Sequence, residues 1–247
     1  MMKEAFLEKI NGEWLDDFVY IAKQPLIDMG YKIVPYDGDD LEHTLVMRNP
    51  DPNTDVCIGS VQGTVRFFEA CGVEVPKYLG YPDQLKKYLG RKIETTTFGN
   101  LGDDFPYFVK PADDVKMFTG DVVSNPKHLE YLRDFDKCQP ETPVIKSEVM
   151  EFLSEYRVFV SHGKIYDVKH YKGTWKEHIS SNIVEMMVRD YTDCPSAYTL
   201  DVGLDSSGLT RLVEVNDMWA IGSYGMDGRD YALLCVRRML EIMRNRK

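Results

Sequence analysis

Two carboxylates and one amide lie close together late in the sequence. Asp201 lies in the segment DVGLD, and Glu214 and Asn216 lie in LTRLVEVN, with the turn-forming residues 206–208 between them. If the two segments pair as a β-hairpin, Asp201 falls opposite or diagonal to Glu214. The two-residue period of a strand then places Glu214 and Asn216 on one face. The spacing predicts that three oxygen ligands converge.

Such a group of side chains suits a divalent cation. The two acids have apolar neighbours in both segments, so they would repel each other and be poorly solvated without a cation or a strong donor. Mg²⁺ prefers hard oxygen ligands and completes its shell with water and substrate phosphates. Alternation alone would favour an ordinary hairpin with a polar outer face, because strands commonly expose every second residue. The trio predicts an Mg²⁺ site, and the polar face is the alternative.

Two lysines could hold the phosphates of a nucleotide. Lys110 ends the apolar segment YFVK, and Lys116 follows a short loop before the segment 118–120, FTG. Lysine is a mobile point charge for phosphate oxygens, although each lysine taken alone is better explained as a solvated surface charge. The chain contains neither GxxxxGK[ST] nor a strand-linked GxGxxG, so P-loop and Rossmann nucleotide sites are unsupported.

Arg157 stands in the middle of the apolar segment EYRVFV. Its guanidinium could add a planar donor fork to the same anion site. A structural ion pair with Glu155 or Glu148 would also explain a charge at this position.

Changes in pattern divide the chain into two parts. Residues 1–104 mix helix-like and strand-like segments and are expected to form a small α/β lobe. Residues 105–247 are dominated by strand-like segments separated by turn signals, which indicates mostly antiparallel sheet. The helices expected are WLDDFVYIAKQPLIDM, TVRFFEACG and PDQLKKYLG in the first part, and NPKHLEYLRDF, ISSNIVEMMVRDY and DYALLCVRRMLEIMRNRK in the second. The predicted fold class is α+β, or mixed α/β.

Length and charge restrict the function further. The chain has 247 residues and a formal net charge of −10, which argues against general nucleic-acid binding because such proteins need a basic face for phosphates. No apolar run approaches the ~20 residues that span a bilayer, and the N-terminal segment lacks a signal-peptide core. The five cysteines form no CxxC pair, so they are expected to be reduced thiols. A cytoplasmic protein without a membrane partner is expected.

The ordered set of motifs FVKP, SEVMEFLSEYRVFV, LDVG and VEVN resembles the ATP-grasp superfamily. The resemblance covers residues 105–224. The spacing of KPADDVKMFTG, SEYRVFV and LVEVNDMWAIGSYG is especially similar to the R-two-K clade of bacteria and phages, and more distantly to the eukaryotic cell-division-cycle 123 family. This resemblance implies an ATP-grasp fold with ATP between two α+β subdomains, preceded by the N-terminal lobe.

The resemblance also implies roles for particular residues. Lys110 and Lys116 would contact the phosphates of ATP, and Glu155 would hold the ribose hydroxyls. The metal ligands would be the trio identified above, Asp201, Glu214 and Asn216. The adenine would be held by Glu148 with the backbone of Val149, Met150 and Glu151.

Two departures from the superfamily pattern concern catalysis. Many ATP-grasp ligases carry an arginine two residues before the metal aspartate, where this chain has Thr199. Arg157 and Lys169 are therefore the residues expected to meet the transition-state charge. The glycine-rich flap is reduced to 118–120.

The activity implied by the resemblance is an ATP-dependent ligation. Mg-ATP would phosphorylate a carboxylate on a small molecule, peptide or protein, and an amine, thiol or similar nucleophile would attack the acylphosphate. Cations and flat side chains near the metal hairpin could bind this acceptor, unless the aromatics are core and the cations solvated. These residues are Lys172, Lys176, Arg229, Trp175, Trp219 and Tyr224.

Two other functions remain as alternatives. The similarity to the cell-division-cycle 123 family suggests an ATP-binding assembly factor or chaperone that fixes a conformation around a protein partner without ligation. A kinase-like transfer to a hydroxyl group is the third possibility. A ligase turns over ATP when its acceptor is present, whereas an assembly factor binds ATP with little chemistry.

Overall fold

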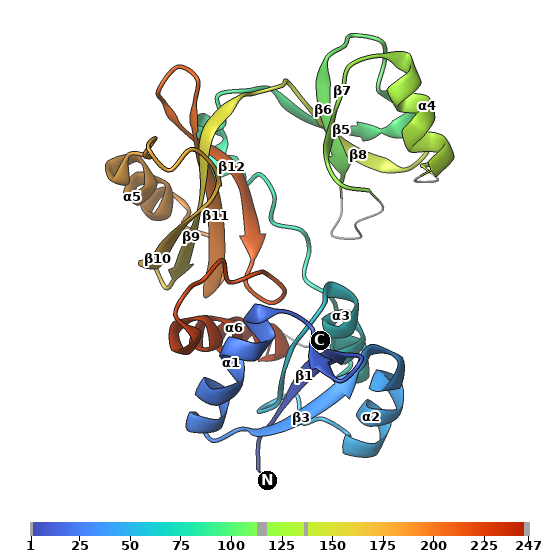
Figure 1. Ribbon diagram of the computed structural model, residues 1–247, viewed down its shortest axis with the longest axis vertical. Coiled ribbons are helices and arrows are strands. Elements are labelled where there is room, and N and C mark those ends of the chain that lie inside the picture. The colour runs from blue at the N-terminus through green and yellow to red at the C-terminus, as the bar shows by residue number, and fades with distance from the viewer. Residues whose placement is uncertain (1, 113–117, 136–137, 245–247) are drawn as a thin grey trace.

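The computed structural model describes residues 2–112, 118–135 and 138–244. Figure 1 shows three lobes, and each is built around its own β-sheet. Each sheet has its own hydrophobic core. The mixed α+β class predicted from the sequence is confirmed.

The first lobe is built on a mainly parallel sheet with β1 at its centre. Strand β1 (Glu4–Ile10) pairs in parallel with β3 (Lys32–Asp37) and β4 (Val56–Ile58), and antiparallel with β2 (Glu13–Trp14). A central parallel strand is covered on both faces, so its sequence shows no alternation. Ala5, Phe6 and Leu7 are accordingly all fully buried, and this strand was not predicted.

Helices cover this sheet and fix its position against the rest of the molecule. They are α1 (Asp17–Asp28), α2 (Leu41–Arg48), α3 (Val61–Ala70) and the C-terminal helix α6 (Gly228–Arg244). The predicted helices at α1, α3 and α6 are confirmed, with Pro25 inside α1. Helix α2 was missed; it has eight residues and no side-chain cap. Because α6 returns to pack on α1, the chain's last element helps to build its first lobe (Figure 1).

A buried carboxylate closes the start of α3. Glu8 is 5% exposed and accepts hydrogen bonds from the backbone N of Ser60 at 2.5 Å, from Ser60 Oγ at 3.1 Å and from the Tyr36 hydroxyl at 3.1 Å. A negative side chain is favoured there because the first N–H groups of a helix lack partners. Gly59 is needed beside it, since a Cβ would lie 2.3 Å from the Tyr36 hydroxyl.

We expect Glu8→Gln to lower the free energy of unfolding by about 1–3 kcal/mol, because an amide turns an N–H toward donors and leaves a buried hydrogen bond unmade. Urea denaturation checks this value. Glu13→Gln, on the exposed strand β2, is the matched control and should be nearly neutral. Equal effects of the two substitutions would contradict a specific role for Glu8.

The second lobe is an antiparallel sheet in the order β5-β8-β6-β7. Its strands are β5 (Ile93–Thr97), β8 (Pro143–Ser147), β6 (Tyr107–Pro111) and β7 (Asp121–Val123), with helix α4 (Pro126–Phe135) packed on one face. The 3₁₀ helix η3 (Phe98–Asn100) adds Phe98 to this core. Helix α4 confirms the prediction for that segment.

The third lobe is the antiparallel sheet β10-β9-β11-β12. Its strands are β9 (Phe152–Ser161), β10 (Lys164–Gly173), β11 (Ala197–Asp205) and β12 (Thr210–Asp217). One face packs against helix α5 (Ser181–Asp190) and the 3₁₀ helix η2 (Asp83–Tyr88). The sequence predicted a helix at both places, and at η2 the helix is of the 3₁₀ type. The other face is apolar beneath α6 and polar beyond it, because Ala197 and Phe159 belong to the core of the first lobe whereas Asp201 and Arg157 do not.

No helix in the described part of the chain combines the length and apolar character needed to cross a membrane.

Candidate functional site

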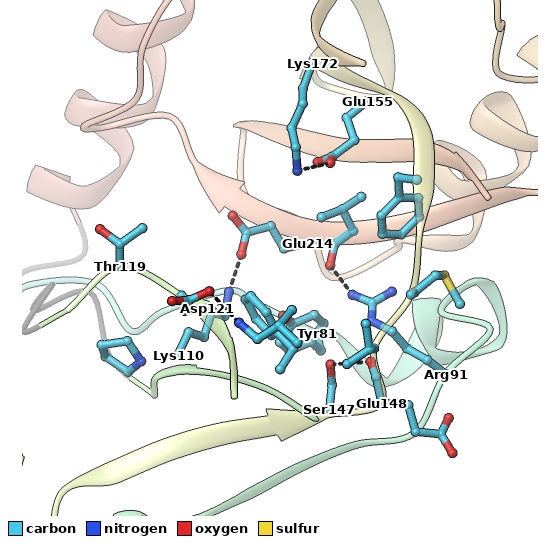
Figure 2. Close-up of a pocket in the computed structure, with 18 of the residues that line it drawn as sticks. Tyr81, Arg91, Lys110, Thr119, Asp121, Ser147, Glu148, Glu155, Lys172 and Glu214 are labelled. Atoms are coloured by element: carbon cyan, nitrogen blue, oxygen red, sulfur yellow. Dashed lines mark hydrogen bonds and ion pairs between the residues drawn. The ribbon is translucent and has the colours of Figure 1, made fainter. Parts of the chain in front are cut away.

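A cavity of about 570 Å³ lies between the second and third lobes (Figure 2). The strands of both sheets contribute to its walls, and so does the segment 71–82, which leads from α3 toward η2. The volume is in the range of cavities that hold small-molecule ligands. The residues that line it include Tyr78, Tyr81, Arg91, Lys110, Thr119, Gly120, Glu148, Val149, Met150, Phe152, Glu155, Tyr171, Lys172, Glu214 and Asn216.

The predicted hairpin forms, and its register brings Asp201, Glu214 and Asn216 together. Asp201 is directly opposite Glu214, and Thr199 is opposite Asn216. The Asn216 amide lies 3.1 Å from Asp201 Oδ2 and 3.2 Å from Glu214 Oε1. Three oxygen-bearing side chains therefore meet at one point on the polar face of the sheet.

Both carboxylates of this trio are paired with a cation of the protein. Arg157 donates from Nε to Asp201 Oδ1 at 2.8 Å and from Nη2 to Asp201 Oδ2 at 2.7 Å. Lys110 Nζ forms an ion pair with Glu214 Oε2. Asp201 is 3% exposed, and its burial raises the pKa of this carboxyl although Arg157 opposes the shift.

The chemistry of this donor set fits Mg²⁺. Two carboxylates and an amide oxygen are hard ligands, and a carboxamide can turn its oxygen toward the centre that its nitrogen faces here. Among the described residues no three or more His, Cys, Asp and Glu side chains are arranged to hold a metal, so the trio depends on the Asn216 amide as its third ligand.

Lys110 is held in a cage of two tyrosines at the end of β6. Its Nζ donates to the Tyr78 hydroxyl at 2.5 Å and lies 5.0 Å from the centre of the Tyr78 ring and 5.1 Å from that of Tyr81. Burial alone would lower the pKa of Lys110, but the Glu214 carboxylate outweighs it and the pKa is raised. The lysine is therefore charged at neutral pH, as binding a phosphate requires.

The residues predicted for the adenine and the ribose lie along one wall. Glu148, Val149 and Met150 line the cavity, and Glu148 accepts a hydrogen bond from the Lys92 backbone N at 2.8 Å. Glu151 is exposed, outside the cavity lining.

Glu155 forms a buried carboxylate at the end of this wall. Only 5% of Glu155 is exposed, and it accepts from the Tyr171 hydroxyl at 2.8 Å and from Lys172 Nζ at 2.6 Å. A carboxylate held in this way is a suitable acceptor for hydroxyl groups.

The two residues predicted for catalysis are neighbours on the polar face. Lys169 on β10 is in register with Arg157 on β9, which is in register with Asp201 on β11. Lys169 forms an ion pair with Asp167 at 3.0 Å and does not line the cavity. The suggested structural partners of Arg157, Glu155 and Glu148, are wrong, because its guanidinium pairs with Asp201.

The reduced flap, residues 118–120, borders the cavity. Phe118, Thr119 and Gly120 line the cavity. Lys116, the second predicted phosphate ligand, lies outside the described residues.

The residues predicted for the acceptor do not form one cluster. Trp219 is 5% exposed and packs on Phe68 in the core of the first lobe, so its prediction as an accessible wall is wrong. Trp175 is exposed, as are the predicted cations Lys176 and Arg229. Lys172 lines the nucleotide-sized cavity instead.

Tyr224 covers the guanidinium of Arg157. Its ring stacks on Tyr171 at 5.0 Å between centroids and lies 4.5 Å from Arg157 Cζ. Tyr224 is 47% exposed, so it presents one edge of this stack to solvent.

Among the cavity residues that were not predicted from the sequence, Tyr78, Tyr81 and Arg91 come from the region between the first two lobes. Arg91 donates to the backbone carbonyls of Leu212 at 2.9 Å and Val213 at 2.8 Å, so its guanidinium is fixed against β12. The only sequence signal is the cluster of aromatic and basic residues in YLGY and GRK, which follows no strand or helix period.

Comparisons with solved structures agree on the fold. D-alanine–D-alanine ligase from Bacillus anthracis complexed with ATP has a TM-score of 0.54 and 14% identity, with 100% of this chain and 96% of that chain covered. N5-carboxyaminoimidazole synthetase from Staphylococcus aureus complexed with ADP has a TM-score of 0.61 and 11% identity, with 96% and 77% covered. L-amino acid ligase from Bacillus licheniformis has a TM-score of 0.57 and 11% identity, with 97% and 75% covered.

The family is identified from the sequence. No curated protein matches this chain. A family model described as ATP-grasp domain, R-two-K clade family 2, matches residues 88–234, which is more than half of the chain and includes both sheets around the cavity. The resemblance stated from the motifs is therefore confirmed, and the chain belongs to the R-two-K clade of ATP-grasp proteins.

Proposed function

We propose that the protein is an ATP-dependent ligase that activates a carboxylate. The observation that carries this proposal is the convergence of Lys110 with Asp201, Glu214 and Asn216 at one end of a cavity of nucleotide size. A phosphate-binding cation beside a hard-oxygen metal site is what phosphoryl transfer requires. The family membership and the likeness to ligase folds support the same reaction class.

The proposed ligand arrangement follows the walls of the cavity. Lys110 would neutralise phosphate oxygens, and Glu155 would accept from the ribose hydroxyls. The adenine would lie near Glu148, against the segment Val149–Met150. Mg²⁺ would be held by Asp201, Glu214 and Asn216, where it would neutralise charge on the transferring phosphoryl group. Lys116 and Glu151 stay predictions for the same ligand.

The proposed reaction has two steps. A carboxylate oxygen of the acceptor attacks the γ-phosphorus, the bond to the β–γ bridging oxygen breaks, and ADP leaves. A nucleophile then attacks the carbonyl carbon of the acylphosphate, the bond from that carbon to the phosphate oxygen breaks, inorganic phosphate leaves, and the proton lost by the nucleophile passes to the phosphate or to solvent. The protein's part is positioning and charge neutralisation, for which the proposed cations are Arg157, in register with Asp201, and Lys169, in register with Arg157. The location of this chemistry is proposed to be the cytoplasm.

Thermal unfolding with Mg²⁺ and a non-hydrolysable ATP analogue tests the nucleotide site. A ligand at roughly a hundredfold excess over its Kd stabilises the folded state by about 2.7 kcal/mol, so the melting temperature should rise. Lys110→Ala should remove most of this rise, and Glu214→Ala should remove its Mg²⁺-dependent part. Lys86→Ala, on the exposed side of η2, is the matched control and should keep the full rise.

Two outcomes separate the possible functions. If the wild type shows no Mg²⁺-dependent rise, the nucleotide site is contradicted. If the rise is present, a screen for carboxylate and amine acceptors by ADP release follows. Stoichiometric binding of a protein partner with ATP but without ADP release would favour the assembly-factor alternative.

A further inference from the structure

The ion pair between Lys110 and Glu214 joins two lobes across the cavity (Figure 2). Lys110 is at the end of β6 in the second lobe, and Glu214 is on β12 in the third. Tyr78 completes a triangle: it accepts from Lys110 Nζ at 2.5 Å and donates to Glu214 Oε2 at 3.0 Å. The two charged side chains are only 15% and 24% exposed, so the pair is shielded from water.

The backbone fixes Tyr78 beside Glu214. Val215 N donates to Gly80 O at 2.8 Å, which makes an antiparallel bridge between the connecting segment and β12. Gly80 has φ of +49°, and a Cβ there would lie 2.4 Å from the Tyr78 ring. Only glycine permits this close approach, and the ring is therefore held against Lys110.

The proposed function requires both members of the pair to change partners. A phosphate needs the Lys110 ammonium, and a metal needs the Glu214 carboxylate, but each is occupied by the other. Replacing only one partner would leave a half-buried charge without compensation, which is costly. If phosphate and metal bind together, Lys110 pairs with the phosphate and Glu214 pairs with the metal. One pair of opposite charges is then replaced by two pairs. Phosphate and metal must therefore strengthen each other's binding, and this coupling is reciprocal.

We propose that Tyr78 is a positioning residue that keeps Lys110 and Glu214 paired in the nucleotide-free site, so that nucleotide and metal displace the pair together. This inference rests on the proposed function, because it assumes that phosphate and metal occupy these two side chains. It goes further in assigning the connecting segment a part in the coupling between them.

Calorimetric titration with a non-hydrolysable ATP analogue, in EDTA and in excess Mg²⁺, tests the inference. Tyr78→Phe keeps the ring and all charges but removes both hydrogen bonds. We expect it to bind the analogue about three- to tenfold tighter in excess Mg²⁺, because nucleotide and metal then displace a weakened pair. In EDTA the gain should be smaller, because the freed Glu214 carboxylate has no metal and has also lost the Tyr78 hydrogen bond. A residue with a merely structural role would tighten neither affinity.

Glu214→Gln tests the same exchange by a second route. Without the carboxylate, Lys110 is free for phosphate, so we expect about tenfold tighter binding in EDTA and loss of the Mg²⁺ effect. A metal ligand that did not compete for Lys110 would show the second change without the first. Tyr20→Phe and Glu130→Gln, both exposed and remote from the cavity, are the matched controls.

Three results would overturn the inference. Weaker binding by Tyr78→Phe in EDTA and in Mg²⁺ would make Tyr78 a direct contact of the nucleotide. Unchanged binding in both conditions would show that Tyr78 does not hold the pair. No binding by the wild type in either condition would overturn the proposed function, and this inference with it. Melting temperatures establish that each variant is folded before titration.

Discussion

Replacing Arg157 by methionine is expected to lower the free energy of unfolding by about 3–5 kcal/mol, because it leaves a buried carboxylate without its counter-charge. Arg157 and Asp201 are 6% and 3% exposed, and two hydrogen bonds of 2.8 Å and 2.7 Å join them. Methionine approximates the length of the arginine stem, so little of the loss comes from packing. Urea denaturation without added metal measures the effect.

The same substitution gives a second and more specific result. With Arg157 gone, Asp201 is a buried anion next to Glu214 and Asn216, and a cation is the best replacement for the guanidinium. We therefore expect excess Mg²⁺ to restore part of the lost stability in Arg157→Met, while it changes the metal-free wild type much less. The dependence of the denaturation midpoint on Mg²⁺ concentration measures this rescue.

Controls separate the buried pair from other effects of the change. Arg133→Met removes a surface arginine whose ion pair with Asp134 is exposed, and it should cost no more than about 1 kcal/mol. Adding Asp201→Leu to Arg157→Met removes the unpaired charge and should recover stability without Mg²⁺ rescue. A loss as small as that of Arg133→Met would show that water or another group already compensates Asp201.

The hairpin of β11 and β12 was predictable because local rules decide its register. A short turn and two alternating strands leave few pairings, and a slip of one residue would turn the acids toward α5. The structure has Asp201 opposite Glu214, one of the two pairings expected. The partners of these acids were less predictable, since Arg157 and Lys110 come from other strands. Strand order across a sheet is not encoded in the period of any one strand.

The tyrosines around Lys110 were missed for a different reason. Tyr78 reaches the site because the connecting segment bridges to β12 through Gly80 and Val215, which are far apart in the sequence. One backbone bridge leaves no period in the sequence. The same limit applies to Trp219, whose burial against Phe68 depends on how the first lobe packs on the third.

The buried centre of the first lobe shows a third limit. Strand β1 carries Glu4, Glu8 and Lys9, so its composition is unlike that of a buried strand. Glu8 is tolerated inside because three donors from β3 and the start of α3 converge on it. Those donors come from segments more than twenty residues away in the chain. The site's local geometry could thus be predicted, whereas contacts between segments far apart in the sequence could not.

One row of charges crosses all four strands of the third lobe. Lys169, Arg157, Asp201 and Glu214 are successive register partners on β10, β9, β11 and β12. The two acids, on β11 and β12, form one half of the row, and the two cations, on β9 and β10, form the other; Glu214 lines the cavity, and the other three do not. Arg157 is committed to Asp201, whereas the ion pair of Lys169 is with Asp167, outside the metal trio. Of the two cations in this row, Lys169 is therefore the one that can neutralise the negative charge of a bound acceptor.

We expect Lys169→Met to reduce the rate of ADP formation by about 10²–10³-fold, because a positive charge that meets the charge of the reacting acceptor stabilises the transition state more than the ground state. Binding of the Mg²⁺-bound ATP analogue should change less than about twofold, since Lys169 does not line the nucleotide cavity. Initial rates with an acceptor identified by ADP release, and calorimetric titration of the analogue, give the two values. Lys164→Met, at the exposed start of the same strand, should leave both unchanged. A rate equal to that of the wild type would reduce Lys169 to the partner of Asp167 and leave Arg157 to meet the transition-state charge.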